Sequence, residues 1–120
     1  MLAPVSRRSA FIRLRTTTNK VRSGPVRVAH QASSELPAAA FTVPKSVGSA
    51  VVRNRVKRRL RAILHEIYQN TPDLFLGGDY LFMVSSSLDD FGYSKLYATV
   101  AGLLNSVKSK GSKNAEDKGR

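Results

Sequence analysis

Arg53-Asn54-Arg55-Val56-Lys57-Arg58-Arg59-Leu60-Arg61 places six cations in nine residues on a segment with helical periodicity. Apolar residues recur through and beyond it at spacings of three and four, which predicts one buried stripe on a helix. The helix should run from residue 50 to 68 or 69. The stripe is formed by Val52, Val56, Leu60, Ile63 and Ile67.

The cations of this helix are arranged around the stripe. At roughly 100° per residue, Asn54, Lys57, Arg58 and Arg61 fall on the side away from it. Arg55 and Arg59 lie on one flank and Arg53 on the other. The chain has only eight acidic residues to neutralise such a surface, so the natural partner is a phosphate backbone.

Composition narrows the class of protein. One hundred and twenty residues with 42% hydrophobic content suit one globular domain, and the net charge of +12 favours a polyanion as partner. The absence of cysteine excludes disulfides, thiolate metal sites and cysteine nucleophiles. No apolar run reaches the roughly 18 residues that span a bilayer. We therefore expect a cytoplasmic protein, although residues 1–15, rich in Arg and Ser without acids, would also suit a transit peptide.

Two further helices and three strands are expected around the basic helix. Residues 6–14 should form a short basic helix, and residues 26–30 and 38–43 two strands that pair antiparallel. The apolar run 79–84 is typical of a buried central strand. The last helix has a leucine-rich stripe. The chain is thus predicted to be an α+β sandwich of one sheet and its helices, with a single domain over 1–107 and a disordered basic tail over 108–120.

Catalytic chemistry finds no support in the side chains. His30 and His65 do not have a metal-ligand spacing, and Asp89-Asp90 reads better as a helix cap than as a Mg²⁺ site. Gly77-Gly78 lacks a following lysine and is a turn, not a phosphate loop. We predict no catalytic residue and no metal held by the protein.

From Phe41 to Arg61 the chain resembles the protein component of bacterial ribonuclease P. That family has a strand ending in Ser-Lys-Lys, then Gly-x-Ala-Val, Arg-Asn, Lys-Arg and a further Arg. One departure is that Pro44 and Ser46 flank Lys45 where the family usually has Ser and a second Lys. The matching positions are Lys45, Gly48, Ala50, Val51, Arg53, Asn54, Lys57, Arg58 and Arg61.

The resemblance implies a fold, partners and site residues. The fold is an α/β sandwich with a left-handed crossover at the basic helix. The partners are a large catalytic RNA and precursor tRNA, whose 5′ leader is removed by chemistry that belongs to the RNA and its Mg²⁺. The protein would be an accessory subunit with no membrane and no obligate protein partner. The resemblance implies leader contacts from Phe11, His30 and Lys45, and catalytic-RNA contacts from Arg53, Asn54, Arg55, Lys57, Arg58 and Arg61.

Three other classes share part of this pattern. A ribosomal-type RNA binder would use the same basic helix without a leader cleft. A membrane-surface protein would want bulky aromatic residues on the apolar face, where this helix has Val, Leu and Ile. An autonomous nuclease would need a carboxylate or histidine cluster.

Overall fold

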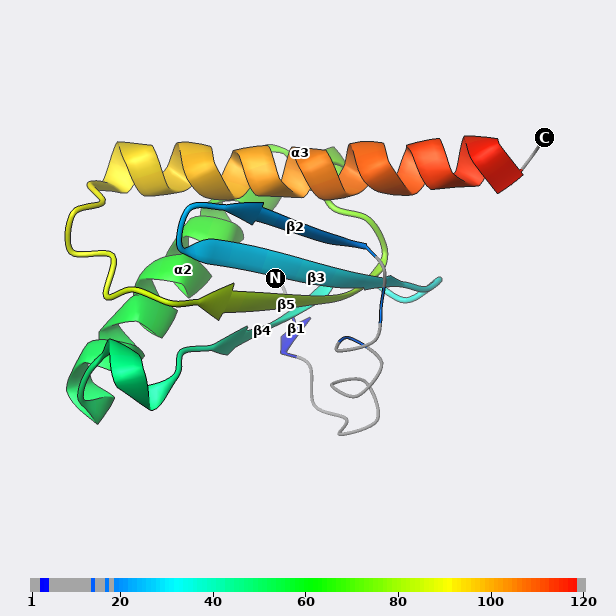
Figure 1. Ribbon diagram of the computed structural model, residues 1–120. Coiled ribbons are helices and arrows are strands. Elements are labelled where there is room, and N and C mark those ends of the chain that lie inside the picture. The colour runs from blue at the N-terminus through cyan, green and yellow to red at the C-terminus, as the bar shows by residue number, and fades with distance from the viewer. Residues whose placement is uncertain (1–2, 5–13, 15–16, 18, 119–120) are drawn as a thin grey trace.

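The computed structural model describes residues 3–4, 14, 17 and 19–118, with residues 3–4 and 111–118 described by their backbone alone. Five strands form one mixed sheet in the order β1-β4-β5-β3-β2, so β5 is central as its apolar run predicts (Figure 1). β4 is parallel to β5 and to β1, whereas β3 is antiparallel to β5 and to β2. The strands are β1 (Ala3–Pro4), β2 (Lys20–Ser23), β3 (Val26–Ala32), β4 (Ala38–Thr42) and β5 (Gly78–Val84).

The strand pairing corrects one sequence prediction. β3 and β4 follow each other in the chain but do not pair, because β5 lies between them and bonds to both. β3 pairs instead with β2 across a tight turn at Gly24, whose φ of 57° is left-handed. The sequence did not predict β2, whose residues are mostly exposed, nor the two-residue β1. The sheet is therefore wider than expected.

Two long helices cover one face of the sheet (Figure 1). α2 spans Ala50–Asn70 and α3 spans Tyr93–Lys118, with short 3-10 helices η1 (Lys45–Val47) and η2 (Pro72–Leu74) before and after α2. α2 connects the parallel neighbours β4 and β5 from behind the sheet in the view of Figure 1, which makes this crossover left-handed. The expected α+β sandwich is confirmed.

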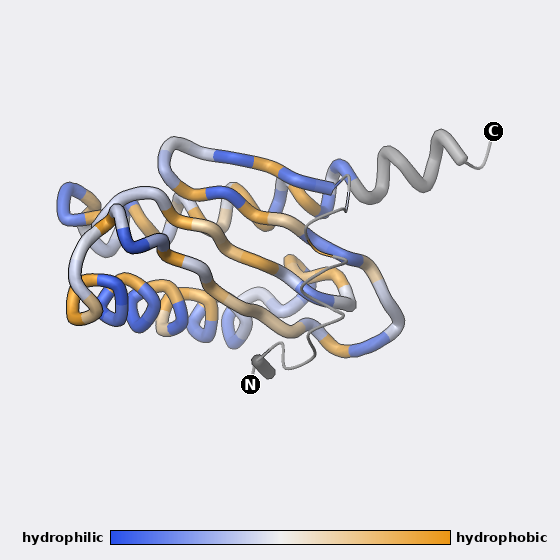
Figure 2. The backbone as a smooth tube through the Cα atoms, turned by 60° about the horizontal axis from the view of Figure 1, so that its bottom comes forward, coloured by the Kyte–Doolittle hydropathy of each residue, from blue (hydrophilic) through white to orange (hydrophobic). Residues whose placement is uncertain are grey.

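The main core lies between the sheet and these helices. The predicted stripe of α2 is buried at Val56, Leu60, Ile63 and Ile67, with Leu64 in addition. In Figure 2 the tube of α2 is hydrophobic along one side of the helix and hydrophilic along the other. The other members of the core come from the sheet and α3, including Val26, Val28, Tyr80, Phe82, Val84, Leu96, Val100, Leu103, Leu104 and Val107.

The opposite face of the sheet has a smaller apolar cluster. Leu14 is fully buried there against Ala29 and Leu81. Leu14 is helical, but the rest of the helix predicted over residues 6–14 lies outside the described residues. Ala40 and Met83 are partly buried and pack against this cluster.

The last helix extends beyond residue 107, where the sequence predicted the end of the domain. α3 continues to Lys118, so residues 108–118 are helical where we predicted a disordered tail. Lys108 Nζ donates to the carbonyl of Asp73 at 2.5 Å, and Lys110 Nζ donates to the carbonyl of Lys20 at 3.1 Å. The segment has no proline and contains lysine, alanine and glutamate, which are good helix formers.

Candidate nucleic-acid interface

The start of α2 is fixed by local hydrogen bonds that orient its cations. Ser49 caps the helix, because its Oγ accepts from the backbone N–H of Val52 at 3.3 Å. Arg53 is half-buried, and its Nε donates to the carbonyl of Gly48 at 3.2 Å. The guanidinium of Arg53 is thus held against the first turn of the helix.

The flank of α2 that faces β4 carries Lys57 and Arg61, one turn apart. The Arg61 guanidinium carbon lies 5.6 Å from the centre of the Phe41 ring, within the range of a cation–π contact. Lys57 lines a groove at the end of β4. Farther round the helix, Asn54 and Arg58 are exposed. This side of α2 therefore offers cations both to the groove and to solvent.

The other flank of α2 serves the fold. Arg59 Nη1 donates to the carbonyl of Leu88 at 2.9 Å, and Nη2 donates to that of Phe91 at 2.5 Å. Arg55 forms an ion pair with Asp89 at 3.2 Å, with both side chains well exposed. Leu88 is buried with a φ of 61°, so the loop between β5 and α3 turns sharply where Arg59 binds it. Arg59 thus clamps this loop to α2.

Arg59→Ala should destabilise the protein by about 1–3 kcal/mol, because two loop carbonyls lose a charged donor. Arg58→Ala is the matched control, since Arg58 is the exposed neighbour on the same helix. Urea unfolding followed by circular dichroism measures both. Equal stability of the two variants would contradict the clamp.

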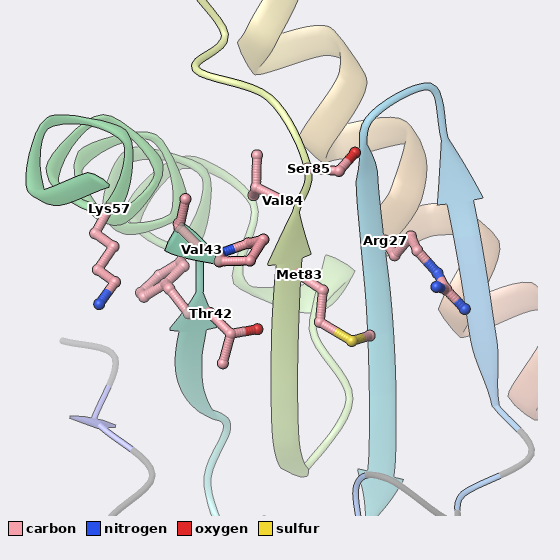
Figure 3. A pocket seen from close by; sticks show the side chains of 9 residues that line it. Arg27, Thr42, Val43, Lys57, Met83, Val84 and Ser85 are labelled. Atoms are coloured by element: carbon pink, nitrogen blue, oxygen red, sulfur yellow. The ribbon is translucent and has the colours of Figure 1, made fainter. Parts of the chain in front are cut away.

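The groove lies on the sheet face that the helices leave open. Its volume is about 460 Å³, and Figure 3 shows Lys57 on one side, Arg27 on the other, and Thr42 and Met83 between them. Both of its side walls therefore carry a cation. The lining residues are Arg27, Phe41, Thr42, Val43, Pro44, Lys57, Met83, Val84 and Ser85.

Sequence reasoning missed Arg27. It is exposed on β3 between the buried Val26 and Val28. The alternation of that strand already directs Arg27 to the face opposite the helices. The sequence did not predict that β3 pairs with β5. Only the pairing of Arg27 with Met83 brings this cation to the groove.

The three residues assigned to the leader have different positions. Lys45 is exposed in η1, directly after Pro44 of the groove. Phe11 lies outside the described residues. His30 is 1% exposed, in β3 beside the ring of Tyr80, with 4.4 Å between ring centres. Its side chain shares the helix-covered face with Val26 and Val28, so its burial argues against a leader contact.

The environment of His30 favours its neutral form. Nε2 donates to the carbonyl of Gly77 at 3.0 Å, while Nδ1 is buried without a hydrogen-bond partner among the described residues. Burial lowers the pKa of His30 below 6.5, opposed by the Gly77 hydrogen bond and the charge of Asp79. Burial also raises the pKa of the neighbouring Tyr80 to about 12.

His30 should make stability depend on pH. The unfolded state takes up this proton near pH 6.5 and the folded state only at lower pH, so the contribution is complete above pH 6.5 and is lost as pH falls toward the folded pKa. Urea unfolding between pH 7.5 and about 5 should show a decline that His30→Gln flattens. The control is His65→Gln, and an equal flattening by it would contradict this origin.

The described part of the chain has neither a cluster of metal ligands nor a membrane-spanning helix. No group of three or more His, Asp or Glu side chains there could hold a metal ion. No helix there is long and apolar enough to cross a membrane.

Comparison with known proteins agrees with a basic helix beside an open sheet face. The family model for ribonuclease P matches residues 3–108. The chain belongs to the bacterial ribonuclease P protein family. The resemblance read from residues 41–61 is therefore confirmed.

Similar proteins support this membership. The chain is 34% identical over 70 residues to the ribonuclease P protein component of Citrifermentans bemidjiense, and this match covers 58% of this chain and 57% of the relative. It is 43% identical over 60 residues to that of Micrococcus luteus, which covers 50% and 41%. The matches thus span about half the length of these curated relatives.

Solved structures of ribonuclease P proteins share the fold. The Staphylococcus aureus protein superposes with a TM-score of 0.70 at 17% identity, covering 87% of this chain and 94% of that one. The Thermotoga maritima protein gives 0.70 at 16% identity, covering 85% and 94%. At such identities the likeness concerns the ribonuclease P protein fold alone.

Proposed function

We propose that this chain is the protein subunit of ribonuclease P, which binds the catalytic RNA and the 5′ leader of precursor tRNA. In this role it assists endonucleolytic removal of the leader to give the mature tRNA 5′ end. Family membership and the fold support the proposal. The observation that carries it is the cationic side of α2, which adjoins both solvent and a groove on the open sheet face.

The catalytic RNA is assigned to the outward side of α2. Asn54, Arg58 and Arg61 are exposed, and guanidinium groups suit bidentate contacts with phosphate. Arg53 and Lys57 adjoin this surface. Arg55 can join it only when a phosphate replaces Asp89 as its partner. Because that ion pair is exposed, the exchange has a small energetic cost.

The leader is assigned to the groove. Lys57 and Arg27 flank it and Lys45 follows it in the chain, so phosphates of a single strand would find cations along its walls. Phe11, which the family resemblance places on the leader side, would offer a ring to an unstacked base. His30 is left out of this assignment because it is buried.

The chemistry of cleavage is assigned to the RNA and to the Mg²⁺ ions that the RNA binds. The protein residues in this proposal position phosphates and lower the repulsion between two polyanions. None of them is proposed to transfer a proton or to attack the scissile bond.

Reconstitution tests the proposal. Cleavage of precursor tRNA by the catalytic RNA is measured at low Mg²⁺ with and without this chain, and the proposal requires faster cleavage with it. A ribosomal-type RNA binder would bind RNA without increasing the cleavage rate. No increase at protein concentrations that saturate the catalytic RNA would overturn the proposed function.

Arg58→Ala with Arg61→Ala should weaken binding to the catalytic RNA while leaving the fold intact, because both side chains are exposed. Each lost phosphate contact should flatten the slope of log K against log salt by roughly 0.7–0.9. Filter binding over a salt series measures this slope, with Lys95→Ala on α3 as the control. A weaker affinity with an unchanged slope would contradict ionic contacts.

A further inference from the structure

Two arginines lie directly opposite each other on neighbouring strands. Arg22 of β2 pairs in register with Arg27 of β3, and both are exposed. Directly opposed side chains on a sheet have Cβ atoms about 4.5–5.5 Å apart, and like charges there are destabilising. Among the described residues neither arginine has an ion-pair partner. The like-charge contact between these two arginines therefore destabilises the folded state.

The register extends this pair into a row across the open face of the sheet. Arg27 pairs with Met83 of β5, and Met83 pairs with Thr42 of β4. Lys57 of α2 lies beyond Thr42 on the other side of the groove (Figure 3). The row thus has two cations at one end, Met83 and Thr42 in the middle, and a cation at the other end.

On this face of the sheet, the cations of the row lie far from the carboxylate of Asp79. The same alternation that places Arg27 and Met83 on the open face also places Asp79 of β5 there. Asp79 is four residues from Met83 along the strand, which is about 13 Å. No carboxylate of the paired strands is therefore closer to the arginine pair, and a polyanion approaching the row meets cations first.

We propose that Arg22 and Arg27 bind the phosphate backbone of single-stranded RNA that crosses the sheet from the Lys57 side of the groove. This inference rests on the proposed function and adds the direction of the strand and its far anchor. Two guanidinium groups side by side can hold one phosphate by several charge-assisted hydrogen bonds. A bound phosphate also removes the repulsion between the two arginines.

The dimensions favour a strand over a small anion. From β4 to β2 there are three inter-strand steps of roughly 4.8 Å, or about 14 Å. One phosphate group is too small to touch both walls, whereas a chain of nucleotides reaches them in turn. Met83, in the middle of the row, suits base faces better than a free ion.

The experiment is a leader-length series with the reconstituted holoenzyme. Affinity is measured for precursor tRNAs whose leaders grow one nucleotide at a time, for the wild type, Arg22→Gln/Arg27→Gln and the single Arg22→Gln. The double variant should match the wild type for short leaders and fall below it beyond a threshold length. At long leaders its salt slope should be flatter by roughly 0.7 for each arginine in contact. Lys57→Gln should show its loss at shorter leaders.

Controls separate this inference from the proposed function. Lys95→Gln, a cation on α3, should follow the wild type at every length. The thermal unfolding temperature of the arginine variants should not be lower than that of the wild type, because loss of an arginine charge relieves like-charge repulsion. A wild type that gains affinity with leader length, together with variants that gain it equally, would overturn the arginine anchor alone. A wild type insensitive to any leader would instead overturn the leader role in the proposed function.

Discussion

Val56→Asp is expected to abolish cooperative folding. Val56 is fully buried in the middle of the α2 stripe, within the main core between helix and sheet. An aspartate there either remains charged in an apolar site or takes up a proton, and both cost several kcal/mol. A domain of this size has only about 5–15 kcal/mol of stability. The expected result is the loss of a sigmoidal urea transition and of the dispersed amide NMR spectrum.

Val51→Asp is the matched control for this substitution. Val51 lies in the first turn of the same helix and is 72% exposed. The same change of side chain should cost little there, and a negative charge near a helix N-terminus is favourable. Cooperative unfolding of the Val56→Asp protein at near wild-type urea concentrations would contradict the assigned faces of α2.

The buried and exposed faces of α2 could be predicted from the sequence, because the helical spacing of the apolar residues alone determines them. Val56, Leu60 and Ile63 are buried as their spacing predicts. Val52, at the edge of the same stripe, is only half-buried, since it lies in the first turn, beside η1. Leu64 is buried although it was not included. Period alone cannot tell how wide a stripe the neighbouring helix and sheet will cover.

The order of the strands in the sheet, unlike the faces of α2, could be predicted only in part from the sequence. The apolar run at 79–84 indicated a central strand, and β5 is central. Its partners depend on the left-handed crossover through α2, which no local pattern encodes. The expectation that consecutive strands pair was therefore wrong for β3 and β4. β2 was missed because its few, mostly exposed residues have no apolar alternation.

In the candidate site, too, local patterns predicted the face of a residue but not its tertiary neighbours. The period separated Arg55 and Arg59 from the outward cations, but only the structure shows that the β5–α3 loop occupies that flank. The burial of His30 was within reach of the sequence, since it follows Val26 and Val28 in the strand alternation. The family resemblance suggested the opposite role. Strand alternation was the better guide at that position.

Phe11→Ala with Lys45→Ala is expected to weaken holoenzyme binding to precursor tRNA that carries a leader of several nucleotides. Stacking of one base on an aromatic ring contributes about 1–3 kcal/mol, which corresponds to roughly 5- to 150-fold in affinity. Lys45 is exposed beside the groove and can add a phosphate contact without reading sequence. Binding to mature tRNA, which has no leader, should barely change. Equilibrium binding of both tRNAs at matched salt and Mg²⁺ measures the difference.

Phe11→Leu separates stacking from packing. Leucine keeps apolar volume for a contact with the sheet but offers no aromatic face to a base. If Phe11 stacks on the leader, Phe11→Leu should lose most of the discrimination between precursor and mature tRNA while keeping the stability of the wild type. If Phe11 only packs against the protein, Phe11→Leu should retain that discrimination. Equal losses of the Phe11/Lys45 double variant for both tRNAs would contradict the leader assignment, because a defect that ignores the leader must arise from the fold or from the catalytic-RNA contacts of α2.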